Sequence, residues 1–108
     1  MDKATFLSKC SERRREDVEI PEVGTVYVQS LTVEDSLFLA GIGDDISRST
    51  CEMIRRSVCD ESGDTFLADA TDEEIYGLGV HIVQRLTKIA NELSGLGDDD
   101  DVASAEKN

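Results

Sequence analysis

The side chains best suited to catalysis or metal binding are few and scattered in this sequence. The one histidine, His81, stands at the start of a predicted helix, where a lone histidine is usually a surface residue. No second histidine or cysteine stands at zinc-ligand spacing from the three cysteines, Cys10, Cys51 and Cys59. The sequence leaves open whether folding brings Cys51 next to His81, but a single pair of this kind is weak evidence for nucleophilic catalysis. We therefore expect no metal site and no cofactor, and we predict that the chain is not an enzyme.

The loops that resemble ligand-binding motifs are incomplete. Residues 41–43 (Gly-Ile-Gly) do not continue into a nucleotide-binding pattern, and no predicted strand leads into them. Residues 60–64 are acidic and contain glycine, but they lack the twelve-residue ligand pattern of a calcium loop and its closing glutamate. The arginines at 13–15 are nearly cancelled by flanking acids. We interpret residues 60–64 as a turn and the arginines at 13–15 as part of a solvated segment.

The charge balance excludes several classes of partner. The chain has 108 residues, with 11 basic and 24 acidic side chains and a formal net charge of −13. Nucleic-acid phosphates and anionic membranes repel such a surface.

Cys51 and Cys59 lie on one predicted helix, about 12 Å apart along its axis, so they cannot form a disulfide within that helix. We expect a protein-binding domain in a reducing compartment, with no nucleic acid or membrane as partner.

Local patterns predict an α+β fold, mainly α, with an N-terminal β-hairpin packed on a small bundle of three to four helices. The hairpin is expected at about 17–31, with Val26, Val28 and Ser30 on one face of its second strand. Helices are expected at about 32–40, 46–59, 71–77 and 80–94, with one or two further turns at 3–10. Residues 1–95 form the single predicted globular domain, and 96–108, with four consecutive aspartates, form a predicted disordered acidic tail.

Helix ends are marked by capping residues. Thr32, with Asp35 three residues on, predicts one N-terminus, and Thr71, followed by three acids, predicts another. Either Asp45 or Ser47 is expected to cap the helix at 46–59, whose apolar positions are Ile46, Cys51, Ile54 and Val58. Gly95 is expected to end the last helix.

The last helix has the clearest amphipathic pattern. Ile82, Leu86, Ile89 and Leu93 recur at helical spacing, and Val83 and Ala90 widen the stripe. Such a stripe normally faces the core, but it can also form one side of a groove for a partner helix. The candidate partner-binding residues are Val83, Leu86, Ala90 and Leu93.

Three segments together resemble the tail assembly chaperone family of long-tailed (siphovirus-type) bacteriophages. They are residues 18–35 (VEIPEVGTVYVQSLTVED), residues 57–67 (SVCDESGDTFL), and the helix end at 89–96 (IANELSGL) with its acidic tail closing in AEKN. The chain departs from relatives at 77–80, where Gly-Leu-Gly-Val replaces a longer, proline-containing link.

The resemblance implies a non-enzymatic chaperone of virion assembly. Its implied partners are the tape-measure protein, which it would keep soluble, and the tail-tube protein, which it would help to recruit; self-association stays open. The implied location is the cytoplasm of the infected bacterial host, with the protein absent from the mature virion. An acidic adaptor, or an inhibitor that mimics DNA by its charge, is the alternative interpretation.

Overall fold

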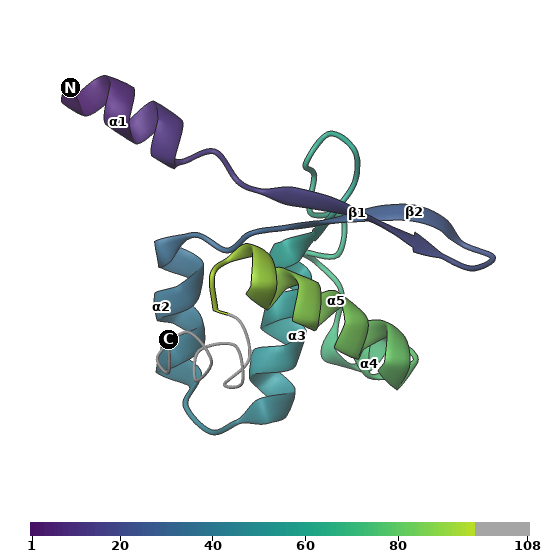
Figure 1. Ribbon diagram of the computed structural model, residues 1–108. Helices are drawn as coiled ribbons and strands as arrows, with labels where there is room; N and C mark the ends of the chain where they lie inside the picture. Colours follow the sequence, from purple (N-terminus) through teal and green to yellow (C-terminus); the bar gives the residue numbers. More distant parts are fainter. Residues whose placement is uncertain (97–108) are drawn as a thin grey trace, which may run out of the picture.

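A three-stranded antiparallel sheet lies across one end of a group of helices (Figure 1). The computed structural model describes residues 1–96, so the predicted tail lies, beyond its first residue, outside the described residues. The described elements are α1 (Lys3–Cys10), β1 (Arg15–Ile20), β2 (Gly24–Gln29), α2 (Val33–Ile42), α3 (Ile46–Ser57), β3 (Val58–Cys59), α4 (Asp72–Tyr76) and α5 (Val80–Leu93). The predicted α+β class is confirmed. Helices α2 to α5 lie on one side of the sheet, whereas α1 projects away from it (Figure 1).

The hairpin of β1 and β2 forms where alternation and turn residues predict it. Its register pairs Arg15 with Gln29 at one end and Ile20 with Gly24 at the other. The turn is closed by a 3.0 Å hydrogen bond from the Val23 N–H to the Ile20 carbonyl. Val28 is buried on the face toward the helices, as its position in the alternation predicts.

The third strand corrects the predicted end of the helix at 46–59. Helix α3 ends at Ser57, and Val58 and Cys59 pair with Val28 and Tyr27 of β2. Val58 has extended backbone angles (φ −81°, ψ 127°), which a β-branched residue favours. The backbone groups of Val58 and Cys59 bond to the free edge of β2 instead of continuing the helix. This long-range pairing therefore ends the helix.

The capping predictions are confirmed at three helix starts and one helix end. Thr32 accepts from the Asp35 N–H, and the Asp35 carboxylate accepts from the Thr32 N–H in return. Thr71 and Glu74 form the same capping box for α4. Asp45, rather than Ser47, caps α3. Gly95 ends α5 with φ +75°, and the Leu96 N–H bonds to the Asn91 carbonyl at 2.8 Å, which is a Schellman motif.

The core lies between the sheet, α3 and α5. Its buried apolar residues are Val18, Val28, Cys51, Ile54, Val58, Ile75, Leu86 and Ala90. One expected apolar position of the helix at 46–59 lies outside the core: Ile46 is 78% exposed. Ile46 is the first residue of α3, and the buried side chains of that helix begin at Cys51. No described helix is both long enough and apolar enough to cross a bilayer.

A pair of isoleucines on α3 tests this assignment of the core. Ile54→Ala should lower the free energy of unfolding by about 3 kcal/mol, because it opens a cavity at a fully buried side chain. The matched variant Ile46→Ala should change it by less than about 0.5 kcal/mol, since that side chain is already in solvent. Urea unfolding followed by circular dichroism measures both; equal losses would contradict the assigned faces of α3.

Candidate partner-binding surface

The four candidate residues on α5 do not share one exposed face. Leu86 and Ala90 are buried in the core, with 3% and 0% of their surface exposed. Val83 and Leu93 are half-buried and pack against that core. Val83 lines an open cavity whose wall is almost entirely apolar, whereas Leu86 lines a second open cavity that also contains Glu22, His81 and Arg85. A partner role for these residues therefore stays a prediction, and the structure directs attention to the surroundings of Val83.

An apolar groove lies where the first turns of α3 and α5 meet α4. It has a volume of about 290 Å³ and is lined mainly by carbon atoms. Its lining residues are Ser47, Thr50, Cys51, Ile75, Tyr76, Leu78, Val80, Val83 and Gln84. Tyr76 and Val80 are 58% and 69% exposed. The groove therefore presents large, exposed apolar side chains and a hydrophobic floor to a binding partner.

Sequence reasoning missed Tyr76, Leu78 and Val80 as parts of a site. They lie in and around the break between α4 and α5, where no helical periodicity links them. The one signal was the short Gly-Leu-Gly-Val link, which brings the end of α4 close to the start of α5. Helix α4 also places Asp72, Glu73 and Glu74, all exposed, beside the groove.

The residues examined for catalysis are not assembled into one site. Cys51 lies in the floor of the apolar groove, whereas His81 lines a different cavity, beside Pro21 and Arg85. Burial raises the pKa of the Cys51 thiol, and the charge of nearby Asp72 adds to the effect. A thiol with a raised pKa is a poor nucleophile at neutral pH. Among residues 1–96, no group of three His, Cys, Asp or Glu side chains is placed to hold a metal ion.

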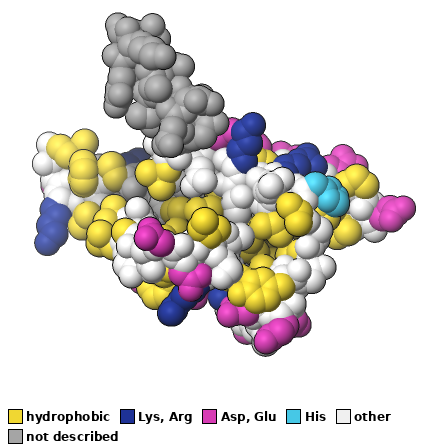
Figure 2. Space-filling view, turned by 90° about the horizontal axis from the view of Figure 1, so that it is seen from below, with side chains coloured by type: hydrophobic (Ala, Val, Ile, Leu, Met, Phe, Trp, Pro, Cys, Tyr) yellow, Lys and Arg dark blue, Asp and Glu magenta, His cyan; other side chains and the backbone are white. Residues whose placement is uncertain are grey.

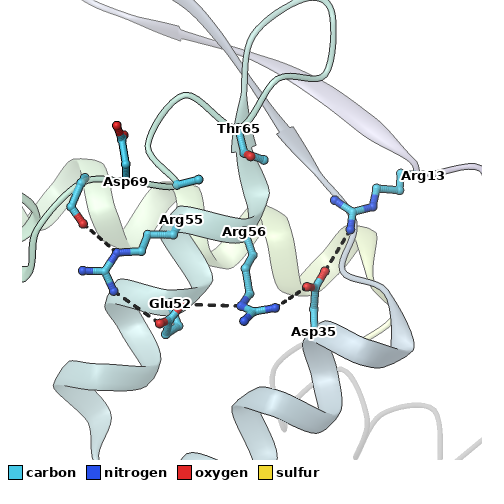
Figure 3. Close-up of a pocket in the computed structure, with 9 residues that line it drawn as sticks. Arg13, Asp35, Glu52, Arg55, Arg56, Thr65 and Asp69 are labelled. Atoms are coloured by element: carbon cyan, nitrogen blue, oxygen red, sulfur yellow. Dashed lines mark hydrogen bonds and ion pairs between the residues drawn. The ribbon is translucent and has the colours of Figure 1, made fainter.

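A second cavity, about 580 Å³ in volume, is lined by charged side chains from several elements (Figure 3). The Asp35 carboxylate bonds to Arg13 at 3.1 Å and to Arg56 at 2.8 Å. Arg56 Nε lies 3.5 Å from Glu52, and Arg56 also stacks over the Phe38 ring, 4.1 Å from its centroid.

The charges around this cavity cancel. Arg13, Arg55 and Arg56 face Asp35, Glu52 and Asp69, which gives three positive and three negative groups. Arg55 bonds in addition to the Ala70 carbonyl and to Asp72. No excess positive charge remains for an anionic ligand, so the network joins α2, α3 and the α4 region and is not a binding site.

Asp35 is the central group of this network. Burial would raise its pKa, but hydrogen bonds from the Thr32 N–H and from Arg56, with the charge of Arg13, outweigh that effect and lower it. Its side chain is only 8% exposed. The ionised form is therefore the form that the fold stabilises.

Comparison with known proteins supports the expected fold. No family model and no curated protein matches this sequence. A solved structure titled "Structure of bacteriophage HK97 tail assembly chaperone" superposes with a TM-score of 0.62 at 15% identity. The match covers 85% of this chain and 98% of that one. The chain has the fold of a phage tail assembly chaperone. At this identity the comparison establishes the fold alone.

Replacement of Asp35 tests the role of the network in this fold. Asp35→Asn should lower the free energy of unfolding at pH 7 by about 2 kcal/mol, because two arginines lose a charged acceptor. The folded pKa of Asp35 lies below the unfolded value of about 3.9. Its contribution is therefore complete above that value and is lost as the pH falls through the folded pKa. The difference between wild type and variant should narrow below about pH 4.

Urea unfolding between pH 3 and pH 7 measures this difference. Glu34→Gln, at the exposed neighbouring position, is the matched control and should differ little from wild type across the range. A stability loss for Asp35→Asn that does not depend on pH would show that the ionised form of Asp35 is not what matters.

Proposed function

We propose that this protein is a tail assembly chaperone of a long-tailed phage, which binds the tape-measure protein and keeps it soluble until the tail tube forms around it. The observation that carries the proposal is the fold shared with the HK97 chaperone over 85% of this chain and nearly all of that one. In this role the protein works in the cytoplasm of the infected host, helps to recruit tail-tube subunits and leaves before the virion is complete. It performs no catalysis.

The apolar groove suits such a partner. A helix with exposed apolar side chains is recognised by laying them into a hydrophobic groove between helices. Here Tyr76, Leu78 and Val80 form the groove's accessible part and Val83 its inner side. These residues lie where α4 meets the first turns of α3 and α5.

Charge adds a preference for the sequence of the bound helix. Glu73 and Glu74 of α4 are exposed on the helix that lines the groove, and Asp72 on the same helix is paired with Arg55. The protein as a whole carries a net charge of −13. We expect the bound segment to combine apolar residues at helical spacing with flanking lysines or arginines, because such flanks complement this surface. The same net charge keeps the complex soluble while the partner is unassembled.

The alternative of a DNA-mimic inhibitor has less support than the chaperone role, because three carboxylates are engaged within the chain itself. A mimic would present unpaired carboxylates along one rigid face. The carboxylates of Asp35 and Glu52 instead pair with arginines of the same chain. The carboxylate of Asp45 caps a helix.

Co-expression with the tape-measure protein of the same phage tests the proposal. The wild-type chain should raise the soluble fraction of that protein and co-purify with it. Val80→Glu should weaken co-purification at least tenfold, because it places a charge in the apolar groove. The variant should stay folded, since Val80 is 69% exposed and begins α5, where an acid is favourable.

The matched control is Val23→Glu, the same substitution at a 72% exposed valine in the hairpin turn. It should co-purify like wild type. Absence of co-purification with the wild-type chain would overturn the chaperone proposal, whereas equal binding by both variants would overturn only the assignment of the groove.

A further inference from the structure

The outer edge of strand β1 carries backbone groups that bond to no strand of the described structure. The sheet has the order β1-β2-β3, so one edge of β1 pairs with β2 and the other is open among residues 1–96. The Ser30 N–H donates to the Arg14 carbonyl at 2.8 Å. Hydrogen-bonded positions alternate along an antiparallel pair. Residues 16, 18 and 20 of β1 therefore bond to β2, and residues 15, 17 and 19 point their N–H and C=O groups outward.

A contact made by Arg85 of α5 agrees with this alternation. Arg85 Nη1 donates to the Glu19 carbonyl at 3.1 Å, as expected for a carbonyl that points away from β2. Helix α5 therefore lies beside the open edge of β1, and Arg85 occupies the last acceptor of that edge. No strand of residues 1–96 bonds to the outward groups of Arg15 and Asp17.

A cavity of about 390 Å³ opens between β1 and the first turns of α5. Its apolar lining includes Val18, Ile20, Ile82 and Leu86. Val18 and Leu86 are core residues with 2% and 3% of their surface exposed, so the cavity reaches the hydrophobic core. His81 also lines it, and Figure 2 shows this histidine, in cyan, next to basic and hydrophobic side chains. An apolar side chain opposite Val18 on an added strand would face this cavity.

The exposed face of β1 favours a basic partner. Asp17 and Glu19 are exposed and lie on the face turned away from the helices, because Val18 between them faces the core. Side chains directly opposite on neighbouring strands interact, and opposite charges stabilise the pair. The whole chain has a net charge of −13, so it attracts a basic segment and repels a second copy of itself.

Glu22, in the turn at one end of the cavity, adds a third acid. The Val23 N–H bonds to the Ile20 carbonyl, so Glu22 is the third residue of a β-turn whose second residue is Pro21. Glu22 has φ +69°, an angle that glycine or asparagine normally adopts at this position of a type II turn. Such strain persists where the surroundings or the function require it. The exposed side chain of Glu22 is accessible to a basic side chain of a partner.

We propose that the open edge of β1 binds an extended segment of another protein in which basic and apolar residues alternate. The segment adds a strand to the sheet and bonds to the backbone of Arg15 and Asp17. Its apolar residues face α5 and the cavity, and its basic residues face Asp17, Glu19 and Glu22. In this mode of recognition main-chain bonds give affinity and alternate side chains give specificity. The cavity shares no lining residue with the groove at α4 and α5, so the inference does not depend on the proposed chaperone function.

Backbone hydrogen exchange followed by NMR tests the added strand. The probe is a capped peptide of alternating lysine and valine, about seven residues long, which is an ordinary strand length. Its control has the same composition with the valines grouped together. At about 1 mM, a concentration suited to weak binding, the alternating peptide should slow exchange of the Arg15 and Asp17 N–H groups at least threefold. The N–H groups of Glu16 and Val18 already bond to β2 and should change little.

Three results of this experiment would overturn the proposal. They are no protection by the alternating peptide, equal protection by the grouped control, and chemical-shift changes confined to the groove at α4 and α5. Protection of Arg15 and Asp17 that grows with protein concentration in the absence of peptide would show that a second copy, and not a basic segment, occupies the edge.

A charge reversal on β1 tests the preference for a basic segment. Asp17→Lys should raise the dissociation constant of the alternating peptide at least fivefold, and added salt should reduce this effect. Glu92→Lys changes the net charge equally at an exposed position near the end of α5, and it should bind the peptide like wild type. Both residues are exposed, so circular dichroism should show folded chains. Equal binding by the two variants would contradict the assigned face of β1.

Glu22→Gly separates a role in binding from a role in folding. The variant should have a higher melting temperature than wild type, because glycine adopts a positive φ without strain. It should nevertheless bind the alternating peptide at least twofold more weakly, because one acid is lost. A more stable variant that binds the peptide like wild type would exclude Glu22 from the binding surface.

Discussion

One carboxylate fixes how helix α2 joins the rest of the protein. Asp35 caps α2 through the Thr32 N–H and accepts from Arg13 and Arg56. The segment before β1, the start of α2 and the end of α3 therefore meet at one side chain. An isolated buried carboxylate would be strongly unfavourable, so the two arginines and the capping bond must be present together. The attachment of α2 is thus largely directional and polar, and Phe38, under the Arg56 guanidinium, is the apolar residue of that helix that contributes to it.

This separation explains why so much apolar surface is compatible with a stable fold. The core is formed by the sheet, α3, α4 and α5, with Ile54 and Val28 fully buried. None of its buried members comes from α1 or α2. Each large apolar side chain left in water forgoes about 1.5–3 kcal/mol that burial would supply. The fold does not depend on that energy, and a high net charge opposes unspecific aggregation through the exposed side chains.

The sequence predicts the features that local chemistry decides and misses those that distant contacts decide. Thr32 with Asp35, Thr71 with Glu74, and Gly95 each mark a helix end, because a cap is made by residues three or four apart. Strand β3 is two residues long and exists only because the edge of β2 is free to pair with it. No periodicity can reveal such a strand.

The candidate site shows the same division. Periodicity on α5 correctly identified the stripe that contains Leu86 and Ala90, but it could not show that both belong to the core. The groove is built around a helix break, by Tyr76, Leu78 and Val80, which belong to no common stripe.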